Sequence, residues 1–109
     1  MDSRGMTTEY DTIEQVPAGN WQDWLAQAGG MLIDVREPIE WAMGTLPGAE
    51  RISLAGIPAS LDRLDRSTPL LIVCRSGNRS YAVARFLSAN GFERVANLAG
   101  GMRALGLAA

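Results

Sequence analysis

The residues best suited to chemistry lie in one short stretch, Cys74-Arg75-Ser76-Gly77-Asn78-Arg79-Ser80. Cys74 is the only cysteine of the chain, and it directly follows the apolar run 70–73, which predicts a buried strand. The pattern of 81–90 predicts a helix. A thiol on a turn that enters a helix meets unpaired backbone N–H groups and a partial positive charge. Such a thiol has a lowered pKa and reacts as the thiolate.

Three residues of this loop strengthen that interpretation. Arg75 and Arg79 add positive charge, and Gly77 permits a backbone conformation in which successive amides converge on an anion. The loop therefore resembles a cradle for a cysteine anion and its negatively charged adduct. The alternative is that Cys74 is a small buried hydrophobe without chemistry, which is the commoner fate of a lone cysteine.

Composition narrows the classes of function. The 109 residues predict one domain with a real core, 47% of them hydrophobic and 20% charged. The net charge of −2 and the absence of a basic run argue against a nucleic-acid partner. No apolar run is long enough to cross a membrane, and a single cysteine suits the reducing cytoplasm, which is the predicted location.

The chain has no histidine, which excludes a Cys–His pair and a histidine-based metal site. We therefore expect neither a metal nor a cofactor. The loop itself must activate Cys74.

Apolar periodicity alternates between strand and helix patterns along the chain. This alternation predicts an α/β fold, with about five mostly parallel strands and helices on both faces of the sheet. Residues 1–8 are expected to be a disordered leader, and 9–109 to form the domain, which we expect to be monomeric. Strands are predicted at 10–16, 31–35, 52–54, 70–73 and 95–98, and helices at 20–28, 38–41, 56–64, 81–90 and 102–107.

In parallel sheets ligands bind beyond the carboxyl ends of the strands. Asp34, Arg36 and Gly100-Gly101 follow predicted strands in the same sense as Cys74, so they should lie on its rim. A buried carboxylate needs a partner, and Arg79 of the cysteine loop is the expected partner of Asp34. Glu37 and Glu40 are spaced as a helix capping box.

Four motifs, in this order, resemble those of single-domain rhodaneses, the thiosulfate sulfurtransferase-like family. They are Leu32-Ile33-Asp34-Val35-Arg36-Glu37, Gly44-Thr45-Leu46-Pro47-Gly48-Ala49, the stretch 74–80 and Leu98-Ala99-Gly100-Gly101. The resemblance covers nearly the whole chain, from about residue 10 to 105. It departs at Thr45, where the family usually has histidine.

The resemblance implies a rhodanese fold and a sulfurtransferase. Cys74 would take a sulfane sulfur from a small anionic donor such as thiosulfate, become a persulfide, and pass the sulfur to cyanide or a thiol. Arg75 would meet the anionic donor, and Ser76, Gly77, Asn78 and Arg79 would complete the cradle. Ser80, Asp34 and Arg36 would support it.

Two other functions remain open. The chain could be a protein–protein sulfur relay or a regulatory binding module of the same fold. It could also be a phosphatase or arsenate reductase of the Cys-x5-Arg type, although only four residues separate Cys74 from Arg79. That shorter loop makes a smaller ring of amides, which fits a sulfur atom better than a phosphate.

Overall fold

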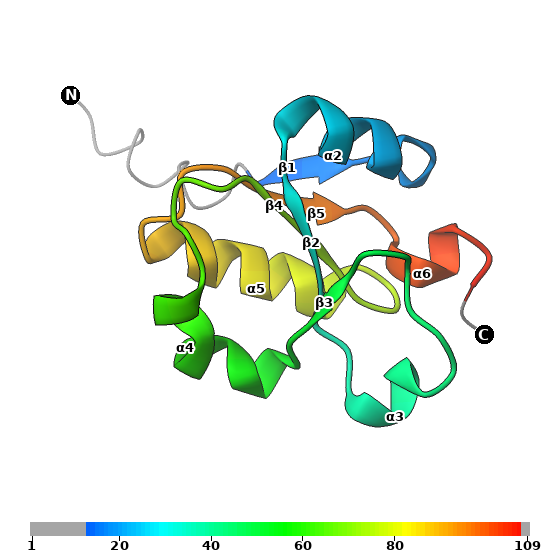
Figure 1. Ribbon diagram of the computed structural model, residues 1–109. Coiled ribbons are helices and arrows are strands. Elements are labelled where there is room, and N and C mark those ends of the chain that lie inside the picture. Colours follow the sequence, from blue (N-terminus) through cyan, green and yellow to red (C-terminus); the bar gives the residue numbers. More distant parts are fainter. Residues whose placement is uncertain (1–12, 108–109) are drawn as a thin grey trace.

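The computed structural model describes residues 13–107, which form a central five-stranded sheet flanked by helices (Figure 1). Residues 1–12 and 108–109, which include the predicted leader, lie outside the described residues. The strands are β1 (Glu14–Val16), β2 (Met31–Asp34), β3 (Glu50–Arg51), β4 (Leu70–Val73) and β5 (Val95–Leu98). The α-helices are α2 (Trp21–Ala28), α3 (Pro38–Trp41), α4 (Ile57–Ser60), α5 (Asn78–Ala89) and α6 (Gly101–Ala104). Short 3₁₀ turns are η1 (Ala18–Asn20), η2 (Leu54–Gly56) and η3 (Leu61–Arg63).

The sheet has the strand order β1-β5-β4-β2-β3, and each neighbouring pair is parallel. The central strand β4 is buried along its whole length, and so is β5. Continuous apolar runs of this kind are typical of parallel strands that are covered on both faces. The α/β fold expected from the sequence is therefore confirmed.

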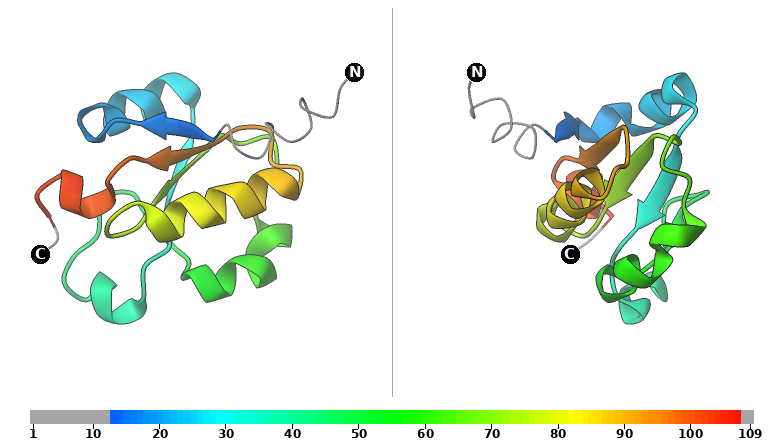
Figure 2. Two further views of the ribbon diagram at one scale, coloured as in Figure 1. Left: turned by 180° about the vertical axis from the view of Figure 1, so that it is seen from behind. Right: turned by 90° about the vertical axis from the view of Figure 1, so that its left-hand side faces the viewer.

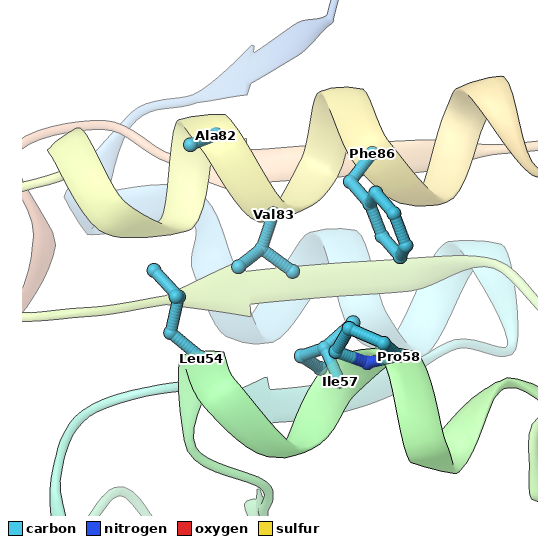
Figure 3. A pocket seen from close by; sticks show the side chains of 6 residues that line it. All are labelled: Leu54, Ile57, Pro58, Ala82, Val83 and Phe86. Atoms are coloured by element: carbon cyan, nitrogen blue, oxygen red, sulfur yellow. The ribbon is translucent and has the colours of Figure 1, made fainter.

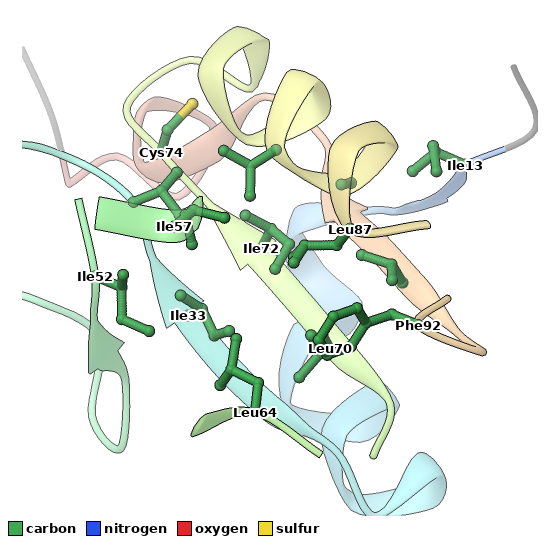
Figure 4. Packing of buried hydrophobic residues seen from close by; sticks show 14 residues of the cluster. Ile13, Ile33, Ile52, Ile57, Leu64, Leu70, Ile72, Cys74, Leu87 and Phe92 are labelled. Atoms are coloured by element: carbon green, nitrogen blue, oxygen red, sulfur yellow. The ribbon is translucent and has the colours of Figure 1, made fainter. Parts of the chain in front are cut away.

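Alternate side chains of β4 enter two separate clusters, as the two-residue period of a strand requires. Leu70, Ile72 and then Cys74 join the cluster beneath α4 and α5, whereas Leu71 and Val73 join the cluster beneath α2 and α6. Figure 2 shows α2 on one side of the sheet and α4 and α5 on the other. Figure 4 shows the first cluster, with Cys74 at the end opposite to Leu70.

Helix α5 follows the cysteine and positions its loop. The helix begins at Asn78, three residues earlier than expected, because Gly77 takes a left-handed conformation with φ 100° and serves as the N-cap. It ends at a Schellman motif, in which the amides of Gly91 and Phe92 donate to the carbonyls of Ser88 and Leu87. The end of α5 is as predicted, and its start brings Arg79 and Ser80 into the first turn.

Four further boundaries differ from the expectations. The last helix, predicted at 102–107, is α6 and ends at Ala104. The first strand is described only over Glu14–Val16, because 10–12 lie outside the described residues. The strand predicted at 52–54 lies two residues earlier, although the amides of Ile52 and Leu54 still donate to the carbonyls of Asp34 and Val35. The single helix predicted at 56–64 is split into η2, α4 and η3.

Candidate active site

Cys74 lies immediately beyond the carboxyl end of β4, at the start of the turn that enters α5. The first turn of α6 packs against this turn from the other side. The amide of Met102 donates to the carbonyl of Cys74 at 2.9 Å, and the amide of Arg103 donates to that of Arg75 at 2.8 Å. The closing turn after β5 therefore fixes the backbone on which the thiol stands.

The sulfur of Cys74 is surrounded by hydrogen-bond donors. The backbone amide of Gly77 lies 3.1 Å from Sγ, and the amide and hydroxyl of Ser80 each lie 3.3 Å away. Residue Cys74 itself is 0% exposed. The predicted cradle is thus formed by the turn and by the first turn of α5, with the sulfur shielded from solvent.

The surroundings lower the pKa of the Cys74 thiol through opposing effects. Burial raises the pKa, because a buried thiolate loses its hydration. Hydrogen bonds from the Ser80 hydroxyl and from the amides of Ser80, Gly77 and Ser76 lower it by more, because they stabilise the anion. The loop therefore favours the thiolate without a general base.

The two charged pairs of the site differ from the pairing expected from the sequence. Asp34 does not pair with Arg79. The Arg36 side chain donates to both carboxylate oxygens of Asp34, at 2.8–3.1 Å, and also to the carbonyl of Gly44 at 2.7 Å. The prediction was wrong because the chain bends directly after β2. The amide of Arg36 donates to Oδ1 of Asp34 at 3.0 Å, and this turn places the Arg36 side chain beside the carboxylate.

Arg79 instead pairs with Glu40 of α3. Its two terminal nitrogens donate to the two oxygens of Glu40 at 2.8 and 2.9 Å, a bidentate geometry. Glu40 also accepts the Glu37 amide in the capping box that the sequence predicted. One carboxylate thus fastens the first turn of α5 to α3.

This pair makes stability depend on pH. The hydrogen bonds from Arg79 hold the pKa of Glu40 at about 2, against an ordinary 4.5. Because the folded pKa is depressed, the stabilisation is fully present above the ordinary value and is lost as the pH falls through about 2. We expect Glu40→Gln to lower the free energy of unfolding by about 1 kcal/mol near neutral pH and by almost nothing at the acid end. Urea unfolding of both proteins between neutral and acid pH measures this difference in stability. A difference that stays constant with pH would contradict the expected role of the pair.

A cavity of about 390 Å³ opens beside the cysteine turn. Arg75 brings a guanidinium group to its wall, where Arg36 and Glu40 also lie, paired with Asp34 and Arg79 respectively. Thr45, at the position where the resembling family has histidine, also faces the cavity. An anionic substrate is suited to such a wall. Within residues 13–107 no cluster of carboxylate, thiol or imidazole groups could hold a metal ion. The complete lining is Arg36, Glu40, Met43, Gly44, Thr45, Arg75, Met102 and Leu107.

Two other hollows are distinct from this cavity. One lies behind the loop, where the exposed residue Asn78 lines it together with Gln15 and Tyr81. Asn78 was predicted as part of the cradle, and the structure places it on this far side. The other lies between α5 and the α4 region and is walled by apolar side chains, as Figure 3 shows. Neither hollow is lined by Arg36 or Arg75.

The sequence interpretation missed two side chains of the site. Glu40 was not predicted to pair with Arg79, because its place in the capping box already accounted for a carboxylate at this position. Asn97 lies 3% exposed in the middle of β5, and its Oδ1 is 2.5 Å from the hydroxyl of Ser80. A lone amide in the apolar run 95–98 was the available signal, because a buried polar group needs partners.

A model of the rhodanese-like domain matches residues 18–107. Among curated relatives, YtwF of Bacillus subtilis, named as a candidate sulfurtransferase, is 44% identical over 73 residues. The match covers 67% of this chain and 70% of YtwF. The thiosulfate sulfurtransferase GlpE of Pseudomonas fluorescens is 31% identical over 77 residues, covering 71% of each chain.

A solved structure gives the same picture for the fold. The rhodanese-like domain protein of Staphylococcus aureus superposes with a TM-score of 0.77 at 32% identity. The superposition covers 84% of this chain and 90% of that protein. The helices of the described residues include none long and apolar enough to cross a membrane.

Proposed function

This chain belongs to the family of rhodanese-like domains, and we propose that it is a sulfurtransferase that moves a sulfane sulfur from thiosulfate to a thiophilic acceptor through a persulfide on Cys74. The observation that carries the proposal is the ring of donors around one sulfur. The amides of Gly77 and Ser80 and the Ser80 hydroxyl lie 3.1–3.3 Å from Sγ, where they stabilise an anion.

The reaction proceeds in two balanced steps. The Cys74 thiolate attacks the outer sulfur of thiosulfate, the new S–S bond forms as the old one breaks, and sulfite leaves with the electron pair. Cyanide or a thiolate then attacks the outer sulfur of the persulfide, takes it, and returns the Cys74 thiolate. Each step follows the exchange chemistry of thiols and disulfides, so a lowered thiol pKa favours both the attacking and the leaving sulfur.

Thiocyanate formation from thiosulfate and cyanide tests this proposal. We expect turnover that saturates with thiosulfate and releases one sulfite for each thiocyanate. Turnover of p-nitrophenyl phosphate, measured with the same preparation, tests the phosphatase alternative, which we expect to be negligible. Phosphate ester hydrolysis without thiocyanate formation would overturn the proposal.

Arg75 is proposed to recognise the charge of the donor, because it lines the cavity beside the cysteine turn together with Arg36. We expect Arg75→Ala to raise the KM for thiosulfate about tenfold, the loss of one charge interaction of about 1.4 kcal/mol at a partly exposed site. The value of kcat should change less. Arg51→Ala removes an exposed arginine outside the cavity lining and serves as the matched control. A KM that is equal in the two variants would contradict this role.

A persulfide carried by a protein or a small thiol is the second candidate donor. Met43 is 81% exposed and Leu107 is 58% exposed, and both line the cavity beside Arg75, so its wall also offers apolar contact. Such a donor lacks the sulfonate charge of thiosulfate. The apolar contact should give it a kcat/KM above that of thiosulfate, and the missing charge should make it insensitive to Arg75→Ala. A preference for thiosulfate that is lost in Arg75→Ala would favour the small anion instead.

A further inference from the structure

A chain of buried polar groups leads away from the sulfur of Cys74. Ser80 is 0% exposed and its hydroxyl oxygen lies between two partners, Cys74 Sγ at 3.3 Å and Asn97 Oδ1 at 2.5 Å. The amide nitrogen of Asn97 donates to Gln15 Oε1 at 3.0 Å and to the carbonyl of Gly77 at 3.4 Å. Because buried polar groups must be hydrogen-bonded, the direction of each donation in this chain matters.

The orientation of the Asn97 amide is fixed by its neighbours. The Gly77 carbonyl can only accept, so the NH₂ group must face it. The Oδ1 atom therefore faces Ser80, and it too can only accept. A hydroxyl has a single proton. Ser80 can give that proton either to Asn97 or to the sulfur of Cys74, and not to both.

Each direction suits a different form of the cysteine. With a neutral thiol, the S–H group donates to Ser80, and Ser80 donates to Asn97. With a thiolate, the sulfur can only accept, so the Ser80 proton turns toward it and Asn97 Oδ1 loses its buried donor. The Sγ atom of a persulfide carries no proton either and likewise only accepts.

We propose that Asn97 is a positioning residue that holds Cys74 toward its protonated form by competing with the sulfur for the one hydroxyl proton of Ser80. In the resting protein this competition favours the neutral thiol. When the sulfur becomes a thiolate or a persulfide, the Ser80 hydroxyl turns and donates its proton to it. The importance of this competition for sulfur transfer rests on the proposed function. Its effect on the thiol pKa does not depend on that function.

The charged groups around Cys74 are separate from this competition. Arg79, in the first turn of α5, interacts electrostatically with Cys74, and its own partner is Glu40 of α3. On β2, Asp34 is paired with Arg36, and α6 contacts the cysteine turn through backbone amides. Arg75 follows Cys74 directly and faces the cavity. A substitution at Asn97 leaves each of these charged groups in place. It also removes the hydrogen bond to the carbonyl of Gly77, so the comparison with and without Ser80 is what isolates the hydroxyl proton.

Two variants should move the thiol pKa in opposite directions. Asn97→Leu keeps the approximate volume and removes the competing acceptor, so the Ser80 proton is free for the sulfur and the pKa should fall. Ser80→Ala removes the donor, so the pKa should rise. A hydrogen bond to a charged group corresponds to a shift of about one pH unit in each case. In the double variant, Asn97→Leu should have no effect, because its action passes through Ser80.

The measurement is a pH titration of the ultraviolet absorbance of the thiolate. The chain has one cysteine, so subtracting the titration of Cys74→Ser leaves the signal of Cys74 alone. Circular dichroism checks folding, and Asn97→Val, with a residue suited to a central strand, replaces Asn97→Leu if that variant does not fold. A thiol pKa that is unchanged or raised in Asn97→Leu would overturn the proposal. So would an effect of Asn97→Leu that is equally large when Ser80→Ala is also present. Opposite shifts in a protein that makes no thiocyanate would uphold it and refute the proposed function.

Discussion

Cys74→Ser is expected to reduce thiocyanate formation to the uncatalysed background while the protein remains folded. A serine hydroxyl does not ionise near neutral pH and does not form a persulfide, so both steps of the proposed reaction are lost. The donors around the side chain can still bind the hydroxyl oxygen. The thiol also packs in the cluster beneath α5, as Figure 4 shows, so the free energy of unfolding should fall by only about 1 kcal/mol.

The rate of thiocyanate formation and the free energy of unfolding in urea are measured for the wild-type protein and for Cys74→Ser. Retention of more than a small fraction of the turnover by a folded Cys74→Ser protein would show that another group carries the sulfur. The chain contains no second cysteine to take over the role.

Gly101→Ala is expected to disable the site without touching a side chain of the cradle. A Cβ atom at Gly101 would collide with the carbonyl oxygen of Cys74 and lie 2.7 Å from the carbonyl carbon and oxygen of Arg75. These are backbone atoms, which cannot move aside cheaply. We expect a loss of about 2–4 kcal/mol in stability and at least about a tenfold fall in thiocyanate formation, because the amides around the sulfur shift.

Gly106→Ala is the matched control for this variant. Gly106 has a similar left-handed φ of 76°, against 61° for Gly101, but a Cβ there meets nothing within 4 Å. The control therefore suffers the same backbone strain without the collision and should cost about 1 kcal/mol with little change in rate. Equal behaviour of the two variants would mean that α6 does not hold the cysteine turn as the structure indicates.

The features that could be predicted from the sequence are those that depend on residues adjacent in the chain. The apolar runs 31–35, 70–73 and 95–98 predicted the three inner strands, because strands covered on both faces need continuous apolar residues. Gly91 and Phe92 predicted the end of α5 for a similarly local reason. The position of Cys74 beyond a strand and before a helix followed from the same neighbours.

The pairing of charges could be predicted only in part. Glu40 meets Arg79 across 39 positions of the chain, and only the tertiary fold brings α3 to the first turn of α5. The Asp34–Arg36 pair was within reach of sequence reasoning, because an aspartate at the end of a strand often accepts the amide two residues later, which brings that residue beside it. Preferring a distant arginine overlooked that geometry. The contact between Ser80 and Asn97 depends on the place of β5 beside β4, which no local pattern specifies.

The most direct measurement of the central claim is the intact mass of the protein after thiosulfate treatment and removal of excess donor. We predict a gain of one sulfur atom on the wild-type chain, located on Cys74 by peptide mapping. Cyanide should then remove it with formation of an equal amount of thiocyanate, and Cys74→Ser should gain nothing. A wild-type protein that forms thiocyanate while never gaining the sulfur atom, or that gains it elsewhere than on Cys74, would contradict a persulfide on this cysteine.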